Sequence, residues 1–167
     1  ETVLAAGSVE GLARLHRWRK ADTMETVGEV LALARDIHGC DLTTGGYSIC
    51  VDSDGLGLGV ADRLQELGVR VIKHHGTMRR GVDTARYENM RAESYGELGV
   101  RLDPVGPWSN ELWALLPDPR LFEEFLAHEK VFASDGVRFR ITPKRAYDSD
   151  EISIQDRIGR SPDSADA

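Results

Sequence analysis

Carboxylate side chains occur at two places in this 167-residue chain where they could bind a divalent metal ion. The stretch YSICVDSDGLGLGVADRL (47–64) is an apolar run that ends in Asp52 and Asp54 and leads through alternating glycines into a helical pattern. The stretch SPDSADA (161–167) places Asp163 and Asp166 three residues apart. Carboxylate oxygens are hard ligands that suit Mg²⁺ or Mn²⁺. Both stretches therefore raise the question whether they bind metal or only shape the chain.

The glycines after Asp52 could also suggest a nucleotide site. A dinucleotide fold needs the spacing GxGxxG directly after a strand, so that backbone N–H groups face the pyrophosphate. Here the spacing is GxGxG, and Asp52 and Asp54 would repel that anion. Acids at the carboxyl end of a parallel strand instead occupy the crevice in which open α/β sheets bind ligands. A metal site is the functional interpretation, and an Asx turn that caps the next helix is the structural alternative.

The C-terminal acids are predicted to lie near the start of a helix. Ser161 can cap this helix and Pro162 suits its first turn. On a helix, Asp163 and Asp166 would share one face, as two ligands of one site would need to. The structural alternative is that they only complement the helix dipole.

Hydrophobic periodicity in the first half predicts an α/β arrangement. Residues 2–6 and 12–18 read as a hairpin, and a helix is expected from Asp22 or Thr23 to Gly39. A strand at 47–52, covered on both faces, a helix at 58–67 and a strand at 69–73 form a βαβ unit.

The second half has a less regular pattern. A loop rich in basic residues (74–81) is followed by helices expected at 84–98 and 119–127 and by a strand at 137–142. The remaining tail is polar, and the length fits a single domain over residues 1–167.

Composition narrows the class of protein. With 41% apolar and 29% charged residues and no long apolar run, the chain is expected to be a soluble globular protein without a membrane partner. Cys40 and Cys50 are too few for a disulfide framework or zinc site, which suggests buried apolar residues in a reducing cytoplasm. The net charge of −7 argues against a nucleic-acid partner unless basic residues gather locally.

Such a local basic group is present. Five basic-type residues fall between positions 73 and 80, and two arginines precede the terminal acids. The candidate phosphate contacts are Lys73, His74, His75, Arg79, Arg80, Arg157 and Arg160. A solvated surface without a ligand is the alternative.

Four segments together resemble one protein family. They are VDSDGLGLGVADRL (51–64), NMRAE (89–93), LPDPRLFEEF (116–125) and DRIGRSPDSADA (156–167). In this order and spacing they are similar to the C-terminal nuclease domain of phage large terminase subunits. The resemblance implies an RNase H-like fold, with a mixed central sheet flanked by helices.

The resemblance also implies a function. Such domains are metal-dependent endonucleases that cut concatemeric double-stranded DNA during packaging, and three acidic positions hold two Mg²⁺ or Mn²⁺ ions. Asp52 matches the second position and Asp166 the third, with Asp163 as an auxiliary ligand, or the reverse within that pair. Asp54 is a further candidate ligand.

The first acidic position of the family has no counterpart in the sequence. It would end a central strand upstream of Glu1, so this strand is expected to be missing or truncated, and the isolated chain to be inactive if so. The implied partners are an N-terminal packaging ATPase domain, the portal protein and the small terminase subunit, in the host cytoplasm at the procapsid portal. No Walker-type GxxxxGK[ST] occurs, so the ATPase is not expected within these residues.

Two rival interpretations remain open. Another RNase H-like nuclease, such as a junction resolvase or an RNA–DNA hybrid hydrolase, would share the acids but not the LPDPRLFEEF and SPDSADA segments. A non-catalytic docking module of the packaging motor would have the fold but lack metal-dependent cleavage.

Overall fold

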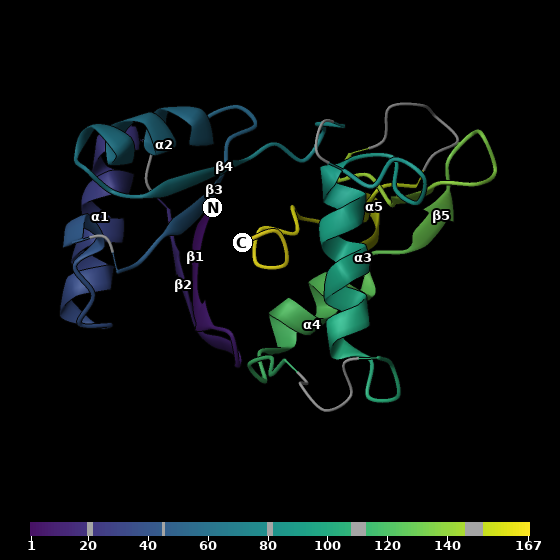
Figure 1. Cartoon of the computed structure of the whole chain (residues 1–167), viewed down its shortest axis with the longest axis horizontal. Helices are drawn as coiled ribbons and strands as arrows, with labels where there is room; N and C mark the ends of the chain where they lie inside the picture. The colour runs from purple at the N-terminus through teal and green to yellow at the C-terminus, as the bar shows by residue number, and fades with distance from the viewer. Residues whose placement is uncertain (20–21, 45, 80–81, 108–112, 146–151) are drawn as a thin grey trace. The chain divides into compact units, whose positions relative to one another are not determined.

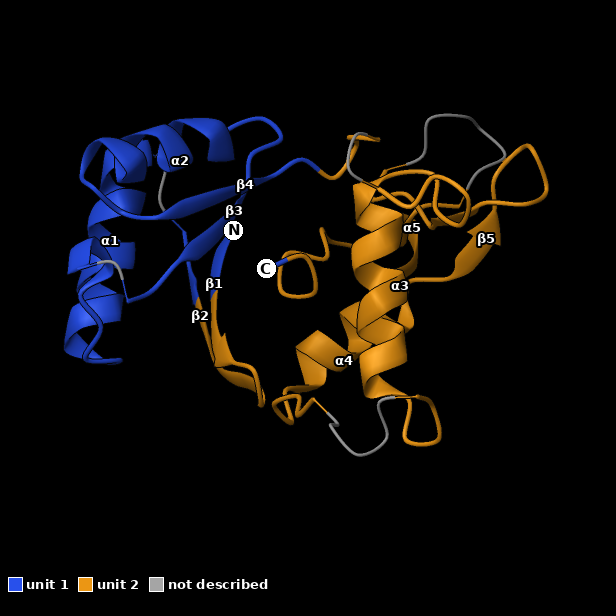
Figure 2. Cartoon of the chain, viewed as in Figure 1, with its two compact units in different colours: residues 1–4, 17–75, 167 blue, residues 5–16, 76–166 orange. Residues whose placement is uncertain are grey.

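The computed structural model of the chain describes residues 1–19, 22–44, 46–79, 82–107, 113–145 and 152–167. These residues form two compact units (Figure 2). Unit 1 comprises residues 1–4, 17–75 and 167, and unit 2 comprises residues 5–16 and 76–166. Helices and strands are interspersed along the chain, which confirms the predicted α/β class. A single domain over 1–167 stays a prediction.

The N-terminal segment forms the predicted hairpin. Strands β1 (Thr2–Ser8) and β2 (Gly11–Trp18) pair with each other, and their two-residue connection requires an antiparallel arrangement. The hairpin tip belongs to unit 2, where Leu12 N donates to Ala114 O at 2.8 Å and Ala114 N donates to Glu10 O at 3.0 Å. The tip is thus anchored by backbone hydrogen bonds within unit 2.

Unit 1 contains the predicted βαβ unit (Figure 1). Strand β3 (Ile49–Asp52) leads through helix α2 (Gly57–Glu66) to strand β4 (Val71–His74), and β3 and β4 are parallel. In their register Asp52 lies opposite His74. Both strands therefore end on the same side of the sheet, where Asp52 and Asp54 lie.

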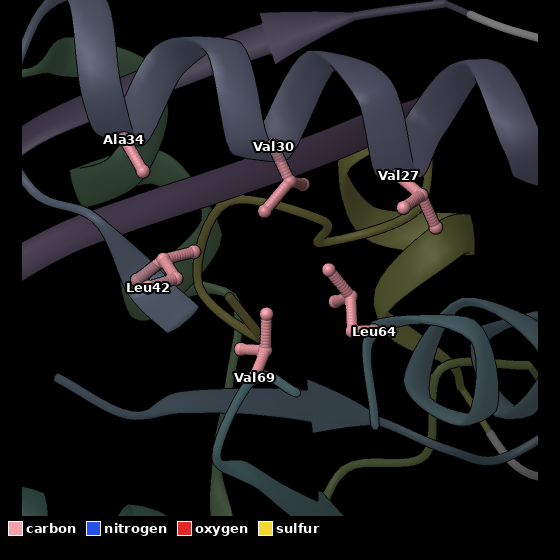
Figure 3. Close-up of a cluster of buried hydrophobic side chains, with 6 residues drawn as sticks. All are labelled: Val27, Val30, Ala34, Leu42, Leu64 and Val69. Atoms are coloured by element: carbon pink, nitrogen blue, oxygen red, sulfur yellow. The ribbon is translucent and has the colours of Figure 1, made fainter. Parts of the chain in front are cut away.

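The core of unit 1 lies between these elements and helix α1 (Thr23–Asp36). Helix α1 begins as predicted, because the Asp22 side chain accepts a hydrogen bond from Met24 N at 2.5 Å. Figure 3 shows three α1 side chains directed toward residues of the 3₁₀ helix η1 (Leu42–Thr44), of α2 and of the loop before β4. These six core residues are Val27, Val30, Ala34, Leu42, Leu64 and Val69.

The prediction that β3 is covered on both faces is wrong. Ile49 and Val51 pack against the core of unit 1, whereas Cys50 and Asp52 are exposed. A four-residue run of mostly apolar type does not distinguish a strand with one covered face from one with two. The exposure of Cys50 also corrects its assignment as a buried apolar residue.

Unit 2 is built around helix α3 (Met90–Leu102), which packs against strand β6 (Phe139–Ile141). The sequence predicts that the helix begins near residue 84. The helix begins later, because the backbone before it forms hydrogen bonds outside the helix. Tyr87 N donates to Asp83 O, and Glu88 N donates to Phe139 O at 2.8 Å, so this segment bridges to β6. The cap is Asn89, whose side chain accepts from Ala92 N.

The remaining elements of unit 2 bring together the last two segments of the resemblance. Helix α4 (Pro119–Leu126) is capped by Asp118 and contacts helix α5 (Ile154–Ile158). Strand β5 (Lys130–Phe132) pairs with β6 in an antiparallel manner. The named strands thus form three two-stranded sheets. Within the described parts of the chain, none of the helices combines the length and apolar character needed to cross a membrane.

Candidate functional site

The first pair of candidate ligands lies where β3 turns into α2. A side chain at Gly57 would place its Cβ atom 1.7 Å from Asp52 O, so only glycine allows this close approach. Gly55 has φ +83°, a conformation that favours glycine. These glycines serve a sharp turn and close packing, and they leave Asp52 and Asp54 exposed at the end of the strand. We call these two residues the acidic strand end.

The acidic strand end contains the Asx turn expected in the structural alternative, but the N-cap of α2 is Leu56, which makes no side-chain cap hydrogen bond. Asp54 N donates to Asp52 Oδ1 at 3.2 Å, and Asp54 Oδ1 lies 3.2 Å from His75 Nδ1. Ser53 N donates to His74 O at 2.8 Å, which holds the turn against β4. Because both carboxylates stay exposed to solvent, this turn does not bury the oxygens that a metal ion would use.

The second pair of acids lies in a turn rather than in the predicted helix. Helix α5 ends at Gly159, whose φ is +70°, and residues 163–165 form a turn in which Asp166 N donates to Pro162 O at 3.1 Å. This bond has the i to i+4 spacing of one helical turn, so Asp163 and Asp166 are one turn apart as expected. We call residues 163–166 the acidic turn.

The Asp166 carboxylate lies in a cationic environment. Its side chain is 12% exposed, and Tyr95 Oη donates to Asp166 Oδ1 at 2.8 Å. Arg91 Nε lies 3.4 Å from the same oxygen, and Lys144 Nζ lies 3.1 Å from Oδ2. Two positive charges and a phenol thus hold a carboxylate that has little contact with water.

Arg91 connects this carboxylate to the rest of unit 2. Its Nη1 donates to Thr142 O at 3.0 Å, and its Nη2 lies 2.8 Å from His128 Nε2. His128 Nδ1 lies 2.6 Å from Glu124 O, which can only accept. The proton therefore lies on Nδ1, and Nε2 accepts from Arg91. The neutral imidazole is what these partners require.

The pKa values of the neighbouring groups agree with this arrangement. Burial lowers the pKa of the His128 imidazole to about 4, and the positive charge of Arg91 also lowers it. Burial, followed by the negative charge of Asp166, raises the pKa of Tyr95 well above its usual range. At neutral pH both rings are uncharged, so Tyr95 remains a hydrogen-bond donor to Asp166.

A second carboxylate holds the backbone of the acidic turn. Glu124 of α4 is fully buried, and its Oε2 accepts from Ser164 N at 2.7 Å and from Ala165 N at 2.9 Å. Its Oε1 is paired with Arg120 Nε at 3.0 Å and lies 3.5 Å from Arg160 Nε. The acidic turn is therefore attached to α4 by charge-assisted hydrogen bonds.

The donors fit a divalent cation chemically. Asp166 Oδ2 is buried and accepts no hydrogen bond, although Lys144 Nζ is near. An ionised oxygen in this state is suited to a cation as partner. Within the described residues of either unit, no group of three or more His, Cys, Asp or Glu side chains could hold an ion by itself. Each unit thus carries one pair of candidate ligands.

The predicted phosphate contacts are divided between the units. Lys73, His74 and His75 belong to unit 1, whereas Arg79, Arg157 and Arg160 belong to unit 2. Arg80 lies outside the described residues.

Most of these basic side chains have acidic neighbours. The pairs are Lys73 with Asp62 at 2.6 Å, His75 with Asp54 at 3.2 Å, Arg79 with Glu88 at 3.6 Å, Arg157 with Glu129 at 2.6 Å and Arg160 with Glu123 at 2.5 Å. A phosphate would compete with these carboxylates.

Sequence reasoning missed the residues that surround Asp166. Arg91 belongs to the NMRAE segment and Glu124 to LPDPRLFEEF, so the resemblance marked both segments without giving either residue a role. Tyr95, His128 and Lys144 lay outside all four segments. Their contacts depend on tertiary packing, which spacing along the chain does not encode.

Comparison with known proteins supports the fold. No protein-family model and no curated protein sequence matches the chain. Solved structures nevertheless share its arrangement over nearly all of its length, and they have the RNase H-like α/β fold predicted from the sequence.

These structures are of the nuclease domain of the large terminase subunit gp2 of bacterial virus Sf6. A point mutant with manganese gives a TM-score of 0.69 at 18% identity, covering 99% of this chain and 80% of that one. The same mutant with manganese and β-thujaplicinol also gives 0.69 at 18% identity, with 99% and 78% covered. The domain without the mutation gives 0.68 at 19% identity, with 98% and 77% covered.

Proposed function

We propose that the chain is the nuclease domain of a viral DNA-packaging terminase and cuts concatemeric double-stranded DNA in a metal-dependent reaction. The observation that carries the proposal is the buried Asp166 carboxylate, whose Oδ1 is held by Arg91 and Tyr95 and whose Oδ2 lies 3.1 Å from the Lys144 ammonium, where a metal cation could take its place. This carboxylate lies within a chain that shares its fold with terminase nuclease domains over 99% of its length. Manganese in the similar structures supports a divalent cation as the cofactor. We propose two ions, Mn²⁺ or Mg²⁺.

The proposed site combines the two pairs of acids. We propose Asp52 and Asp166 as the principal ligands and Asp54 and Asp163 as auxiliary ligands. When bound, the ions polarise the scissile phosphate and lower the pKa of the attacking water.

The residues around Asp166 orient its Oδ2 atom as a proposed metal ligand. Arg91 and Tyr95 hold Oδ1, which fixes the plane of the carboxylate and directs Oδ2 toward Lys144. Lys144 compensates the negative charge of Oδ2 as long as no other cation is near. Because burial and the charge of Asp166 raise the pKa of Tyr95 well above its usual range, the phenol remains a hydrogen-bond donor to Asp166 at neutral pH.

We also propose that basic residues of the two units bind DNA. The candidates are Lys73, His74, His75, Arg79, Arg80, Arg157 and Arg160. If they contact phosphates, DNA affinity should fall by about one power of ten per decade of salt for each contact. The net charge of −7 is compatible with this role because the acids proposed to hold cations contribute to it.

The terminase assignment also supplies the partners and the place of action. The domain would follow a packaging ATPase in the same protein and act with the portal protein and the small terminase subunit. Its place of action would be the host cytoplasm, at the portal of the procapsid.

Plasmid nicking tests the proposal. The chain, together with any residues that precede Glu1 in the full protein, should nick supercoiled DNA in Mn²⁺ or Mg²⁺ and not in EDTA. Asp52→Asn and Asp166→Asn should each abolish nicking. A folded protein that binds the packaging motor but shows no metal-dependent cleavage would favour the docking module, and cleavage restricted to junctions or RNA–DNA hybrids would favour the other nucleases.

A further inference from the structure

Glu124 is a buried carboxylate that is not one of the proposed metal ligands. It lies on α4, its side chain is 0% exposed, and helix α4 already has its own stabilising features. Leu121 fills the core beneath the helix, and the Asp118 side chain caps its start by accepting from Leu121 N at 2.8 Å. Burying a carboxylate removes its hydration at a high cost in free energy. Hydrogen-bond donors and positive charges in the protein must therefore replace the water around Glu124.

Two of these partners are backbone amides of the acidic turn. Glu124 Oε2 accepts from Ser164 N at 2.7 Å and from Ala165 N at 2.9 Å. These are the two amides that lie between Asp163 and Asp166. One oxygen therefore fixes the peptide units that connect the two candidate ligands.

The other oxygen neutralises the charge of the group. Glu124 Oε1 lies 3.0 Å from Arg120 Nε and 3.5 Å from Arg160 Nε. Arg160 itself precedes the acidic turn and also contacts Glu123, the exposed neighbour of Glu124. The carboxylate is thus held from α4 on one side and from the segment after α5 on the other.

We propose that Glu124 is a positioning residue for the metal site and holds the acidic turn in the conformation that presents Asp166. This inference rests on the proposed nuclease function. Residues that orient a metal ligand affect metal affinity without touching the ion, typically by about 10–100-fold. Without Glu124, the amides of Ser164 and Ala165 lose their acceptor and the turn can adopt other conformations.

Glu124→Gln tests the proposal, with Glu123→Gln as the matched control. Both variants neutralise one glutamate of the same helix and remove a charge that faces Arg160, but only Glu124 contacts the acidic turn. Binding of Mn²⁺ is measured by the loss of the free-ion EPR signal, and nicking is followed as a function of Mn²⁺ concentration. The protein is the chain with any residues that precede Glu1.

We expect Glu124→Gln to raise the Mn²⁺ dissociation constant and the Mn²⁺ concentration for half-maximal nicking by about 10-fold or more. Saturating Mn²⁺ should restore most of the nicking rate, which loss of folded protein would not allow. Glu123→Gln should stay within about 2-fold of the parent protein. A folded Glu124→Gln protein with the parent's Mn²⁺ affinity would overturn the inference.

The outcomes separate this inference from the proposed function. If Asp166→Asn retains full nicking, or if the parent protein neither binds Mn²⁺ nor cleaves, the proposed function itself is refuted, and the role of Glu124 is refuted with it. If Asp166→Asn is inactive while Glu124→Gln behaves like the parent, only the role of Glu124 fails.

A measurement on the parent protein covers the case in which Glu124→Gln does not fold. Hydrogen exchange by NMR should show the Ser164 and Ala165 amides exchanging at least about 10-fold more slowly than in an unstructured peptide. Exchange of both amides at the unprotected rate would overturn the inference without any variant.

Discussion

The acidic strand end of unit 1 and the acidic turn of unit 2 place aspartate side chains in opposite environments. Asp52 and Asp54 are exposed. Asp52 accepts a hydrogen bond from the backbone of Asp54, and the Asp54 carboxylate lies beside His75. Asp166 is 12% exposed and is surrounded by an arginine, a lysine and a tyrosine. One site leaves its carboxylates to water, whereas the other replaces water with fixed donors.

This difference indicates how the two sites should respond to substitution. Water can solvate whatever replaces Asp52, so function and folding should separate there. At Asp166 the surrounding cations depend on the carboxylate, so function and folding should change together.

The largest effect is expected for the acids themselves. Asp52→Asn and Asp166→Asn should each lower metal-dependent nicking by at least about 100-fold, because each removes the charge of a proposed metal ligand. Asp52→Asn should leave the free energy of unfolding within about 0.5 kcal/mol of the parent. Asp166→Asn should lower it by about 1–3 kcal/mol, since Arg91 and Lys144 lose their partner. Urea unfolding distinguishes the two, and equal stability losses would remove the contrast between the sites.

Arg91→Ala should have the largest effect on stability. The Arg91 side chain is 16% exposed and contacts Asp166, Thr142 O and His128. Its removal leaves these groups without this donor and takes away one of the two positive charges beside the Asp166 carboxylate. We expect a loss of about 3–5 kcal/mol in the free energy of unfolding.

The matched control for Arg91 is Arg86→Ala in the same unit. Arg86 is 56% exposed, pairs with Glu97 at 3.6 Å and lies over the Tyr87 ring. Its removal should cost about 1 kcal/mol or less. If both variants lose the same stability, Asp166 does not depend on Arg91 in the way described.

Gly57→Ala tests the geometry of the acidic strand end. The added Cβ would lie 1.7 Å from Asp52 O, so the strand and α2 must move apart. The expected cost is about 1–3 kcal/mol, and Asp52 should be displaced with a loss of nicking. Gly28→Ala in α1 is the control, because no atom lies within 4 Å of its added Cβ. It should stabilise the protein by about 0.5–1 kcal/mol, and the reverse order of the two variants would refute the close approach.

The smallest effect concerns the pH dependence of unit 2. The pKa of His128 in the folded state is about 4, below its ordinary value of 6.5, so the unfolded chain takes up this proton first as the pH falls. The contribution of neutral His128 is present above about pH 6.5 and is lost between about pH 6.5 and pH 4. We expect a loss on the order of 1–2 kcal/mol over this range, reduced by the partial exposure of the ring.

Urea unfolding at several pH values checks this prediction by comparison with His128→Gln. Glutamine does not titrate, so the variant should show a smaller decrease in stability from about pH 7 to pH 4.5. Identical pH profiles would mean that His128 takes up its proton at the ordinary pKa in the folded protein.

The sequence predicted the elements that rest on local patterns. The hairpin, α1 and the βαβ unit follow from periodicity and from glycine and aspartate at their ends, and α4 begins at Pro119 as expected. Strand β5 was missed because three residues are too few to show a period. Helix α5 was missed although Ser153 and Asp156 form a capping box, a signal that the sequence does contain.

The candidate site was predicted only in its acids. Asp52 and Asp166 stand out because each follows a recognisable pattern in the chain. Their partners do not, since Arg91 lies 75 residues from Asp166 and Glu124 lies 40 residues from Ser164. The buried contacts that prepare Asp166 therefore become visible only in the folded unit.

The central part of the proposed function is that Asp52 and Asp166 bind the same metal ions. Paramagnetic Mn²⁺ tests it directly, because it broadens the NMR signals of nearby amides without requiring any cleavage. On titration into the chain, with any residues that precede Glu1 included, we expect the amides of Ser53 and Ala165 to broaden together at the same Mn²⁺ concentration. Broadening of one amide alone, or of the two at clearly different concentrations, would contradict the account.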